Sequence, residues 1–436
     1  MPALCLCYEV HEPYRLCRYT VFDMGQNSLY EDDDHNCDAL LLTARTCYLP
    51  MNDLLLKLIR RHGKAFKVAF SISGTALDQF EQYAPEVVES FQALADTGNV
   101  EFVAETAPHS LAFLYSRDEF DIQVREQCER IKRLFGKKPT TFRNTEFVYN
   151  NDLPVALEKL GFKAVLAEGA DHVLGWRSPN YVYRPISTPR MRLLLRNSSL
   201  STDIGLRFND QGWDQWPLTA EKYASWCHSF AASSEIINIF NDYHSFGLRN
   251  PRESGIFDFM EALPAALLAH KDFHFVTPAE AARKIDAVGE VDVPEFMSWD
   301  DEGRDLTAWL GNDMQKDAIH TLYALAPRVR KVGAPDLVRD FERLQTSDHF
   351  HYISTKWFAD FLADRPNPFD SPYDAYITYM NVLADFEMRL TAMEEAAAEA
   401  GKTTRKTPRT TATGTAGKKR AAPAAKAGGA KKKTSA

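Results

Sequence analysis

The sequence lacks the features that mark disulfide-rich secreted domains, zinc ribbons and membrane proteins. Its seven cysteines include no C-x-x-C pair. None of its apolar runs approaches the roughly 20 residues that cross a bilayer, and no basic and apolar leader opens the chain. We therefore expect reduced thiols, most of them buried, in a cytoplasmic protein that does not contact a membrane.

Several catalytic signatures are missing as well. There is no Walker-type G-x-x-x-x-G-K-[ST] segment, no G-x-G-x-x-G after the first predicted strand and no G-x-S-x-G elbow. These absences argue against nucleotide and serine-hydrolase chemistry. Without an H-E-x-x-H segment either, we predict no metal and no cofactor. A metal site assembled from His11, His109, His172 and His244 stays an alternative.

The charge is divided unevenly along the chain. Residues 401–436 hold eleven of the 51 basic residues and none of the 60 acidic ones, which leaves the first 400 residues with a formal charge of −20. Such an acidic body repels polyanions. The final segment has no large apolar residue, so burial cannot offset its ordering entropy, and we predict a disordered basic tail. That tail could contact nucleic acid or an acidic surface, or it could be a solvated extension.

The rest of the chain has the composition of a folded protein, with 45% hydrophobic and 12% aromatic residues. Through the first 290 residues, short β-rich runs alternate with amphipathic helical patterns such as 51–61. This alternation predicts a parallel sheet, and its length suits a closed barrel better than an open, doubly wound sheet. We predict strands over residues 3–10, 66–72, 100–104, 140–143, 163–167, 192–195, 236–240 and 273–276.

Helical patterns replace the β-rich runs from about residue 300. They cover residues 305–329, 336–345, 349–362 and 373–400. The predicted organisation is therefore an α/β barrel domain over residues 1–295, a helical domain over residues 296–400 and a disordered tail over residues 401–436.

Polar and ionisable residues gather after the predicted strands. In a barrel of parallel strands, the loops at the carboxyl ends converge on one mouth, where catalytic groups are found. The side chains that this rule places at the mouth are His11, Glu12, Ser73, Glu105, His109, Asn144, Glu146, Glu168, Asp171, His172, Asn197, Asp242 and His244.

Two carboxylates among these residues suit glycoside cleavage. One of Glu146 and Asp242 would attack or stabilise the oxocarbenium-like centre, while the other would donate a proton to the leaving oxygen. Either one could instead be a solvated loop acid. Aromatic rings can stack on sugar faces. The candidates for stacking near these loops are Tyr14, Trp176, Tyr181, Tyr183, Trp213 and Trp216.

Six segments carry a resemblance that extends over nearly all of residues 1–390. They are VHEPYRL (10–16), GNVEFVAETAPHSL (98–111), FRNTEFVYNN (142–151), AVLAEGADHVLGWRSPNYVY (164–183), NIFNDYHSFG (238–247) and SDHFHYISTKW (347–357). In order and spacing, these segments resemble glycoside hydrolase family 57, in its intracellular α-amylase-like branch. The resemblance implies an incomplete, TIM-like (β/α)7 barrel followed by a helical domain, with retaining action on α-1,4-linked glucans.

The resemblance also implies roles for individual residues. The nucleophile falls on Glu146 and the acid/base on Asp242. Together with the mouth and loop positions above, the residues expected to contact substrate are His11, Glu101, Glu105, His109, Asn144, Trp176, Trp213, His244, Asp348 and His349.

Two positions depart from the family pattern. A motif that commonly reads H-Q-P reads His11-Glu12-Pro13 here, and His244 stands two residues after Asp242, where Glu is common. The main hypothesis is an enzyme of the α-amylase or 4-α-glucanotransferase type that works by double displacement on an α-glucan oligo- or polysaccharide. The alternatives are a catalytically weak or inactive glucan-binding homologue and a metal-dependent carbohydrate hydrolase.

Overall fold

The computed structural model describes residues 2–300, 302–356 and 367–404. Met1–Thr391 form one compact unit, and a second unit begins at Ala392, within helix α17 (Pro372–Thr404). The predicted boundary between residues 295 and 296 falls inside the first unit. The tail was predicted to start at residue 401, which lies inside α17. Residues 405–436, for which disorder was also predicted, lie outside the described residues.

The described strands include seven that close a parallel barrel. Neighbouring strands pair in parallel around the ring, β3 and β4 meet through the Ala104–Phe142 bridge, and β8 pairs with β1. This ring confirms the expected (β/α)7 barrel. Its strands are β1 (Ala3–Val10), β2 (Val68–Ile72), β3 (Val100–Val103), β4 (Thr141–Arg143), β5 (Ala164–Glu168), β7 (Arg192–Arg196) and β8 (Ile236–Asp242).

Three strands outside the ring differ from the sequence-based expectation. Strand β6 (Val182–Pro185), which was not among the predicted strands, runs antiparallel to β7. Strand β10 (Glu290–Val291) pairs with β6. The strand predicted over residues 273–276 is the two-residue β9 (His274–Phe275), which pairs with the start of β1.

Helices cover the outside of the barrel. They are α1 (Asp33–Thr43), α2 (Leu49–His62), α3 (Gly74–Tyr83), α4 (Pro85–Asp96), α5 (Ala112–Tyr115), α6 (Arg117–Phe135), α7 (Asp152–Leu160), α8 (Asp171–Leu174), α9 (Ser198–Gly205), α10 (Ala220–Ser229), α11 (Ile256–Leu268) and α12 (Pro278–Lys284). Among the described residues, no helix is both long enough and apolar enough to cross a bilayer.

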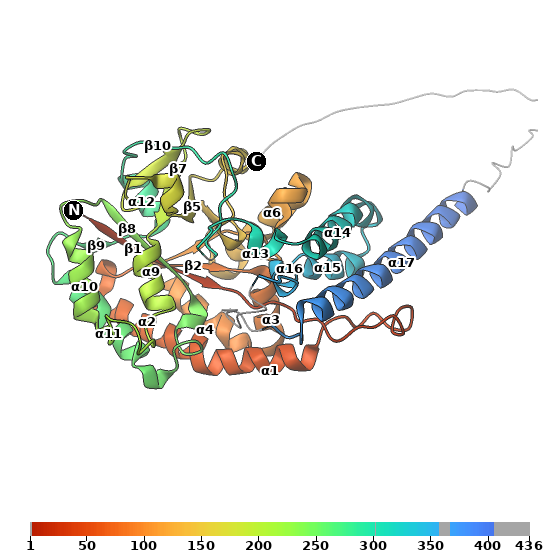
Figure 1. Cartoon of the computed structure of the whole chain (residues 1–436), viewed down its shortest axis with the longest axis horizontal. Coiled ribbons are helices and arrows are strands. Elements are labelled where there is room, and N and C mark those ends of the chain that lie inside the picture. The colour runs from red at the N-terminus through yellow and green to blue at the C-terminus, as the bar shows by residue number, and fades with distance from the viewer. Residues whose placement is uncertain (1, 301, 357–366, 405–436) are drawn as a thin grey trace, which may run out of the picture. The chain divides into compact units, whose positions relative to one another are not determined.

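The helices after residue 300 follow the predicted pattern with one interruption. The helix predicted over 305–329 is two helices, because Asn312 caps the second one and forms a reciprocal capping box with Gln315. The helix predicted over 349–362 is described only as α16, and residues 357–366 lie outside the described part of the chain. These helices gather at one end of the barrel strands (Figure 1) and are α13 (Thr307–Leu310), α14 (Asp313–Val332), α15 (Pro335–Leu344) and α16 (Ser347–Tyr352).

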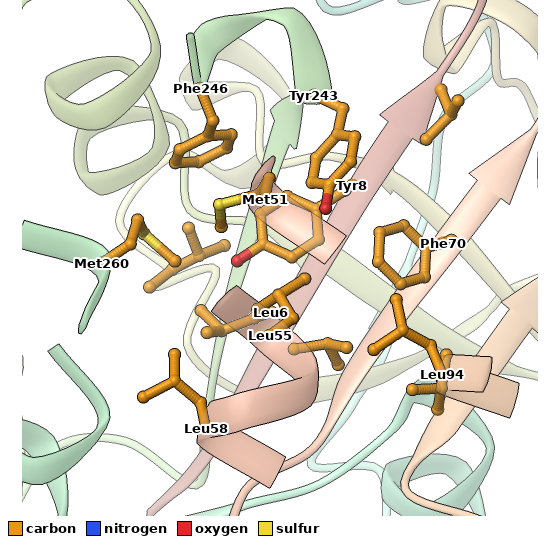
Figure 2. Packing of buried hydrophobic residues seen from close by; sticks show 14 of the residues in the cluster. Leu6, Tyr8, Met51, Leu55, Leu58, Phe70, Leu94, Tyr243, Phe246 and Met260 are labelled. Carbon is orange, nitrogen blue, oxygen red and sulfur yellow. The ribbon is translucent and has the colours of Figure 1, made fainter. Parts of the chain in front are cut away.

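Strand alternation decides which side chains face the helices and which face the barrel lumen. Leu6 and Tyr8 of β1 pack in one cluster with Met51 and Leu55 of α2, as Figure 2 shows. The intervening side chain Cys7 belongs to a separate cluster inside the barrel. By the same alternation, the side chain of Glu9 faces the lumen at the carboxyl end of β1.

Candidate active site

The barrel lumen becomes charged at the carboxyl ends of the strands. Glu9 of β1 is paired in register with Asp242 of β8. Asp242 lies two residues after Phe240, a member of the cluster inside the barrel, and therefore faces the lumen as well. Glu105 follows β3, and Arg143 ends β4. The mouth is thus built from alternate residues of strands that are distant in sequence.

Arg143 ties two of these carboxylates together. Its Nη2 lies 2.8 Å from both Glu9 Oε1 and Glu105 Oε2, and its side chain is fully buried. Burial raises the pKa of Glu9, although Arg143 opposes this shift. Burial would also raise the pKa of Glu105, but Arg143 and His109 outweigh it and lower the pKa below its ordinary value. These three side chains form a buried charged floor under the mouth.

His109 connects this floor to the proposed nucleophile. Its Nδ1 lies 2.8 Å from Glu105 Oε2, and its Nε2 lies 3.5 Å from Glu146 Oε1. The ring stacks on that of His11 at 3.9 Å. Burial alone would lower the pKa of His109, but Glu105 above all, with Glu146 and Glu9, outweighs burial and raises the pKa to about 10. His109 is therefore a cation at neutral pH.

Glu146 sits in a short 3-10 turn after β4, Thr145–Phe147, with its backbone in the left-handed region at φ 56° and ψ 22°. A side chain other than glycine pays roughly 1–2 kcal/mol there, which the surrounding contacts must offset. Oε2 accepts a hydrogen bond from the indole N–H of Trp299 at 2.8 Å, and Oε1 accepts one from Ser347 Oγ at 3.1 Å. The carboxylate is fully buried and fixed in orientation.

Helix α16 brings further groups to the mouth. The backbone N–H of Ser347 donates to the carbonyl oxygen of His109 at 2.9 Å. Asp348 Oδ2 lies 2.8 Å from His11 Nε2, and the other ring nitrogen of His11 lies 2.8 Å from Ser73 Oγ. The structure thus brings the predicted residues His11, His109 and Asp348 together. The helical part of the chain completes the mouth of the barrel.

The two departures from the family pattern contact each other. His244 Nε2 lies 3.1 Å from Glu12 Oε1 and 2.7 Å from the hydroxyl of Tyr48, which itself donates to Glu12. His244 Nδ1 lies 3.6 Å from Asp242 Oδ1, and the backbone N–H of His244 donates to the same oxygen at 3.0 Å. Burial would lower the pKa of His244, but Asp242 and Glu12 outweigh it and raise the pKa to about 9. Glu12 and His244 therefore form a charge pair beside Asp242.

Two cavities meet at Asp242. The first, of about 340 Å³, is lined by residues that include His11, His109, His244 and Asp348. The second, of about 480 Å³, shares Asp242, Arg249 and Trp299 with the first. The Asp242 side chain is 30% exposed, so it reaches both cavities. Glu146 lies behind Trp299 and His109, which form part of the wall of the first cavity.

Several predicted substrate-binding residues do not reach these cavities. Asn144 is buried, with its Nδ2 donating to the carbonyl oxygen of Val148 at 2.9 Å. His349 is buried against the carbonyl oxygen of Arg343, and burial lowers its pKa to about 4. The remaining predicted residues that line neither cavity are Glu101, Glu105, Trp176 and Trp213.

Glu101 lies low in the barrel because it precedes Glu105 by four residues on the same strand path, about 13 Å at the rise of a β-strand. Its carboxylate accepts hydrogen bonds from Thr141 Oγ1 at 2.5 Å and from the backbone N–H of Ala279 at 2.8 Å. The structure places it at the amino end of β3, away from the mouth. The family resemblance placed Glu101 among the substrate-contacting residues, whereas the structure puts it near the start of its strand.

Glu101→Gln is therefore expected to leave kcat/KM on an α-glucan within about twofold of the native value, because this carboxylate touches neither cavity. The loss of a hydrogen-bond acceptor should lower the free energy of unfolding by about 1–2 kcal/mol. Steady-state kinetics and urea unfolding of the two proteins measure both effects. A fall in kcat/KM of a hundredfold with unchanged stability would return Glu101 to the substrate-binding residues.

The charge pair of His244 makes stability depend on pH. Its folded pKa of about 9 exceeds the ordinary 6.5, so its stabilising contribution is complete below about pH 6.5 and is lost as the pH rises through about 9. The native free energy of unfolding should exceed that of His244→Gln by up to about 3 kcal/mol at pH 6, with the gap closing by pH 9 to 10. Urea unfolding across this range measures the gap.

Tyr48→Phe is the matched control for this measurement, because it removes the hydroxyl contact and keeps the Glu12–His244 charges. Its pH dependence should follow that of the native protein. If the gap between the native protein and His244→Gln stays constant from pH 6 to pH 10, the charge pair does not exist in solution.

One group of side chains has the make-up of a metal site. Ligand atoms of Glu9, Glu105 and His109 all lie within 4.8 Å of one another. However, the guanidinium of Arg143 already contacts both carboxylates at 2.8 Å. Because the guanidinium of Arg143 neutralises the carboxylates of Glu9 and Glu105, we assign no metal to this group of side chains.

The chain is similar to known proteins in sequence and in structure. A model of "Glycosyl hydrolase family 57" matches residues 5–294. The protein named "Putative alpha-amylase" from Methanocaldococcus jannaschii is 40% identical over 395 residues, which cover 87% of this chain and 83% of that protein.

Two solved structures share the fold. A family 57 branching enzyme from Thermococcus kodakaraensis aligns with a TM-score of 0.66 and 14% identity, over 89% of this chain and 90% of that chain. The 4-alpha-glucanotransferase from Thermococcus litoralis aligns with a TM-score of 0.64 and 13% identity, over 88% of this chain. This chain spans 59% of the length of the latter structure.

Proposed function

The chain belongs to glycosyl hydrolase family 57, and from this premise we propose that it acts on α-1,4-linked glucans by retaining double displacement. The single observation that supports this most strongly is the fixed, fully buried carboxylate of Glu146, which Trp299 and Ser347 orient beside the cavity that Asp242 lines. The relatives with glucan-active names agree with this substrate class.

In the first step of the proposed mechanism, a carboxylate oxygen of Glu146 bonds to the anomeric carbon while the glycosidic C–O bond breaks. Protonated Asp242 gives its proton to the departing oxygen, and a glucosyl-enzyme ester remains. In the second step, ionised Asp242 takes a proton from water or from a hydroxyl of another glucan. The resulting oxygen nucleophile attacks the anomeric carbon and releases Glu146.

The surrounding residues suit these two roles in different ways. Glu146 is held by donors from Trp299 and Ser347 and faces the cation of His109, an arrangement that favours an ionised, pre-oriented nucleophile. Asp242 is partly exposed where two cavities meet. That position allows it to protonate a leaving sugar and then to activate an incoming water or sugar.

Product analysis after incubation with maltoheptaose tests the proposal. The native protein should convert it, and Asp242→Asn should convert it about 10²–10⁴-fold more slowly because the proton donor is lost. Products that are only shorter would indicate hydrolysis, and longer products would indicate transfer. Binding of maltoheptaose with equally negligible turnover by the native protein and by Asp242→Asn would instead support the glucan-binding homologue.

A further inference from the structure

A third cavity, of about 580 Å³, continues the row of cavities that begins at the first one. Arg207 lines both the second and the third cavity, just as Asp242 lines both the first and the second. The three hollows therefore follow one another, with Asp242 at one junction and Arg207 at the other. Trp213, which the sequence placed in substrate binding, lines the third cavity and not the first two.

The wall of the third cavity carries two tryptophan side chains. Trp213 and Trp226 are half-buried, and their ring centroids lie 6.1 Å apart with an interplanar angle of 72°. Both pack against the hydrophobic core on one side. The guanidinium of Arg207 lies 5.8 Å from the centre of the Trp213 ring. Rigid aromatic surface of this kind stacks on the C–H faces of sugar rings.

Polar groups in the same wall are fixed by the protein. Asn197 Nδ2 donates to Asn180 Oδ1 at 2.9 Å, and Asn197 Oδ1 accepts from the backbone N–H of Leu200. Asn180 is 1% exposed, so this pair of amide side chains is held in place by the protein. Exposed Ser199 and Ser229 add hydroxyl groups to the lining.

The lining of the second cavity includes buried polar atoms that have no hydrogen-bond partner among the described residues. These atoms are Asn241 Oδ1 and Ser245 Oγ. Leaving such buried atoms without a hydrogen-bond partner is unfavourable. A ligand with many hydroxyl groups would satisfy them. The cavity that connects Asp242 to Arg207 thus has the same chemical preference as the tryptophan-lined one.

We propose that the three cavities form one continuous cleft for an α-glucan chain, and that the third cavity, with Trp213 and Trp226, binds sugar units far from the bond that is cut. This inference rests on the proposed function for the identity of the ligand. The third cavity would then make the protein prefer long chains over short ones. A short oligosaccharide that fills only the cavities beside Asp242 gains nothing from Trp213.

The experiment separates binding from turnover by using Glu146→Gln, which keeps the cleft and removes the proposed nucleophile. Dissociation constants for maltotriose and for maltoheptaose are measured by calorimetry on this variant, with and without Trp213→Ala. Trp213→Ala is expected to weaken maltoheptaose binding about tenfold, the equivalent of one stacking contact, and to leave maltotriose binding unchanged.

The matched control is Phe22→Ala in the same background, because Phe22 is an aromatic residue that is 87% exposed and lines none of these three cavities. It should change neither constant. If Trp213→Ala lowers the melting temperature, Ser199→Arg provides a second test. Ser199 is an exposed helical residue in the lining, and a large side chain there should block the third cavity with the same selectivity.

The outcomes separate the cleft from the proposed function. Equal loss of maltotriose and maltoheptaose binding, or no loss of either, would overturn the continuous cleft even if the native enzyme cleaves both sugars. Selective loss of maltoheptaose binding without turnover by the native protein would support the cleft and contradict the proposed enzyme. No binding of either sugar by Glu146→Gln would overturn the cleft, while turnover by the native protein would leave the proposed function standing.

Discussion

Replacing Glu146 with Gln is expected to lower kcat on maltoheptaose by about 10⁴-fold or more, because the amide cannot form the glucosyl-enzyme ester. Gln matches the shape of Glu, so its oxygen can still accept from Trp299 and its amide group can donate to Ser347 Oγ. The free energy of unfolding should therefore change by about 1–2 kcal/mol at most. Single-turnover kinetics and urea unfolding measure the two quantities.

Glu101→Gln is the matched control for this variant. It makes the same chemical change in the same barrel, at a carboxylate that lies away from the mouth. The two variants should therefore differ by several thousandfold in kcat. Comparable activity in Glu146→Gln and Glu101→Gln would remove Glu146 from the mechanism, whatever the family pattern suggests.

Replacing Arg143 with Met is expected to lower the free energy of unfolding by about 3–5 kcal/mol. This change deletes the cation that neutralises Glu9 and Glu105, both of which contact it at 2.8 Å in the barrel lumen. Removing one partner of a buried ion pair leaves uncompensated charge in a medium of low polarity, which costs far more than the pair contributes. Urea unfolding at pH 7 measures the loss.

Two comparisons define the cause of that loss. Arg61→Met removes an arginine whose side chain is 54% exposed and paired with the 51% exposed Glu261, so it should cost no more than about 1 kcal/mol. Adding Glu105→Gln to Arg143→Met should restore part of the stability, because it removes one of the stranded charges. A double variant that is less stable than Arg143→Met alone would show that Arg143 acts through packing rather than charge.

The barrel was largely predictable from the sequence because its strands obey a simple rule. The predicted strand over residues 3–10 coincides with β1, since its apolar residues lie on both faces and polar residues end the run. Strand β6 was missed because no helix lies between it and β7, so it does not fit the alternation of strands and helices that predicts parallel strands. The two-residue strands β9 and β10 are too short for a periodic signal.

Position after a strand predicted most of the candidate site, and the family resemblance added Asp348 of helix α16. His11, His109 and Asp242 were placed at the mouth by this rule, and the structure brings them to one cavity. Glu9 and Arg143 were missed because they lie inside strands. Glu9 lies on the same face of its strand as Cys5 and Cys7, so strand alternation could have shown that it faces the lumen.

Other contacts have no local signal at all. Trp299 and Ser347 reach Glu146 across 153 and 201 residues of sequence, and only the packing of the later helices against the barrel brings them there. The contact between Glu12 and His244 also joins residues that are distant in sequence. Neither departure from the family pattern predicts this contact by itself.

The most direct test of the central claim is to identify the residue that becomes glucosylated. A fluorinated α-glucosyl fluoride that forms the glucosyl-enzyme faster than water releases it would trap the ester, and peptide mass spectrometry would locate it. We expect a single added fluoroglucosyl mass on the peptide that contains Glu146, and no label in Glu146→Gln. Label on any other carboxylate, Asp242 included, would contradict the assignment of nucleophile and acid/base.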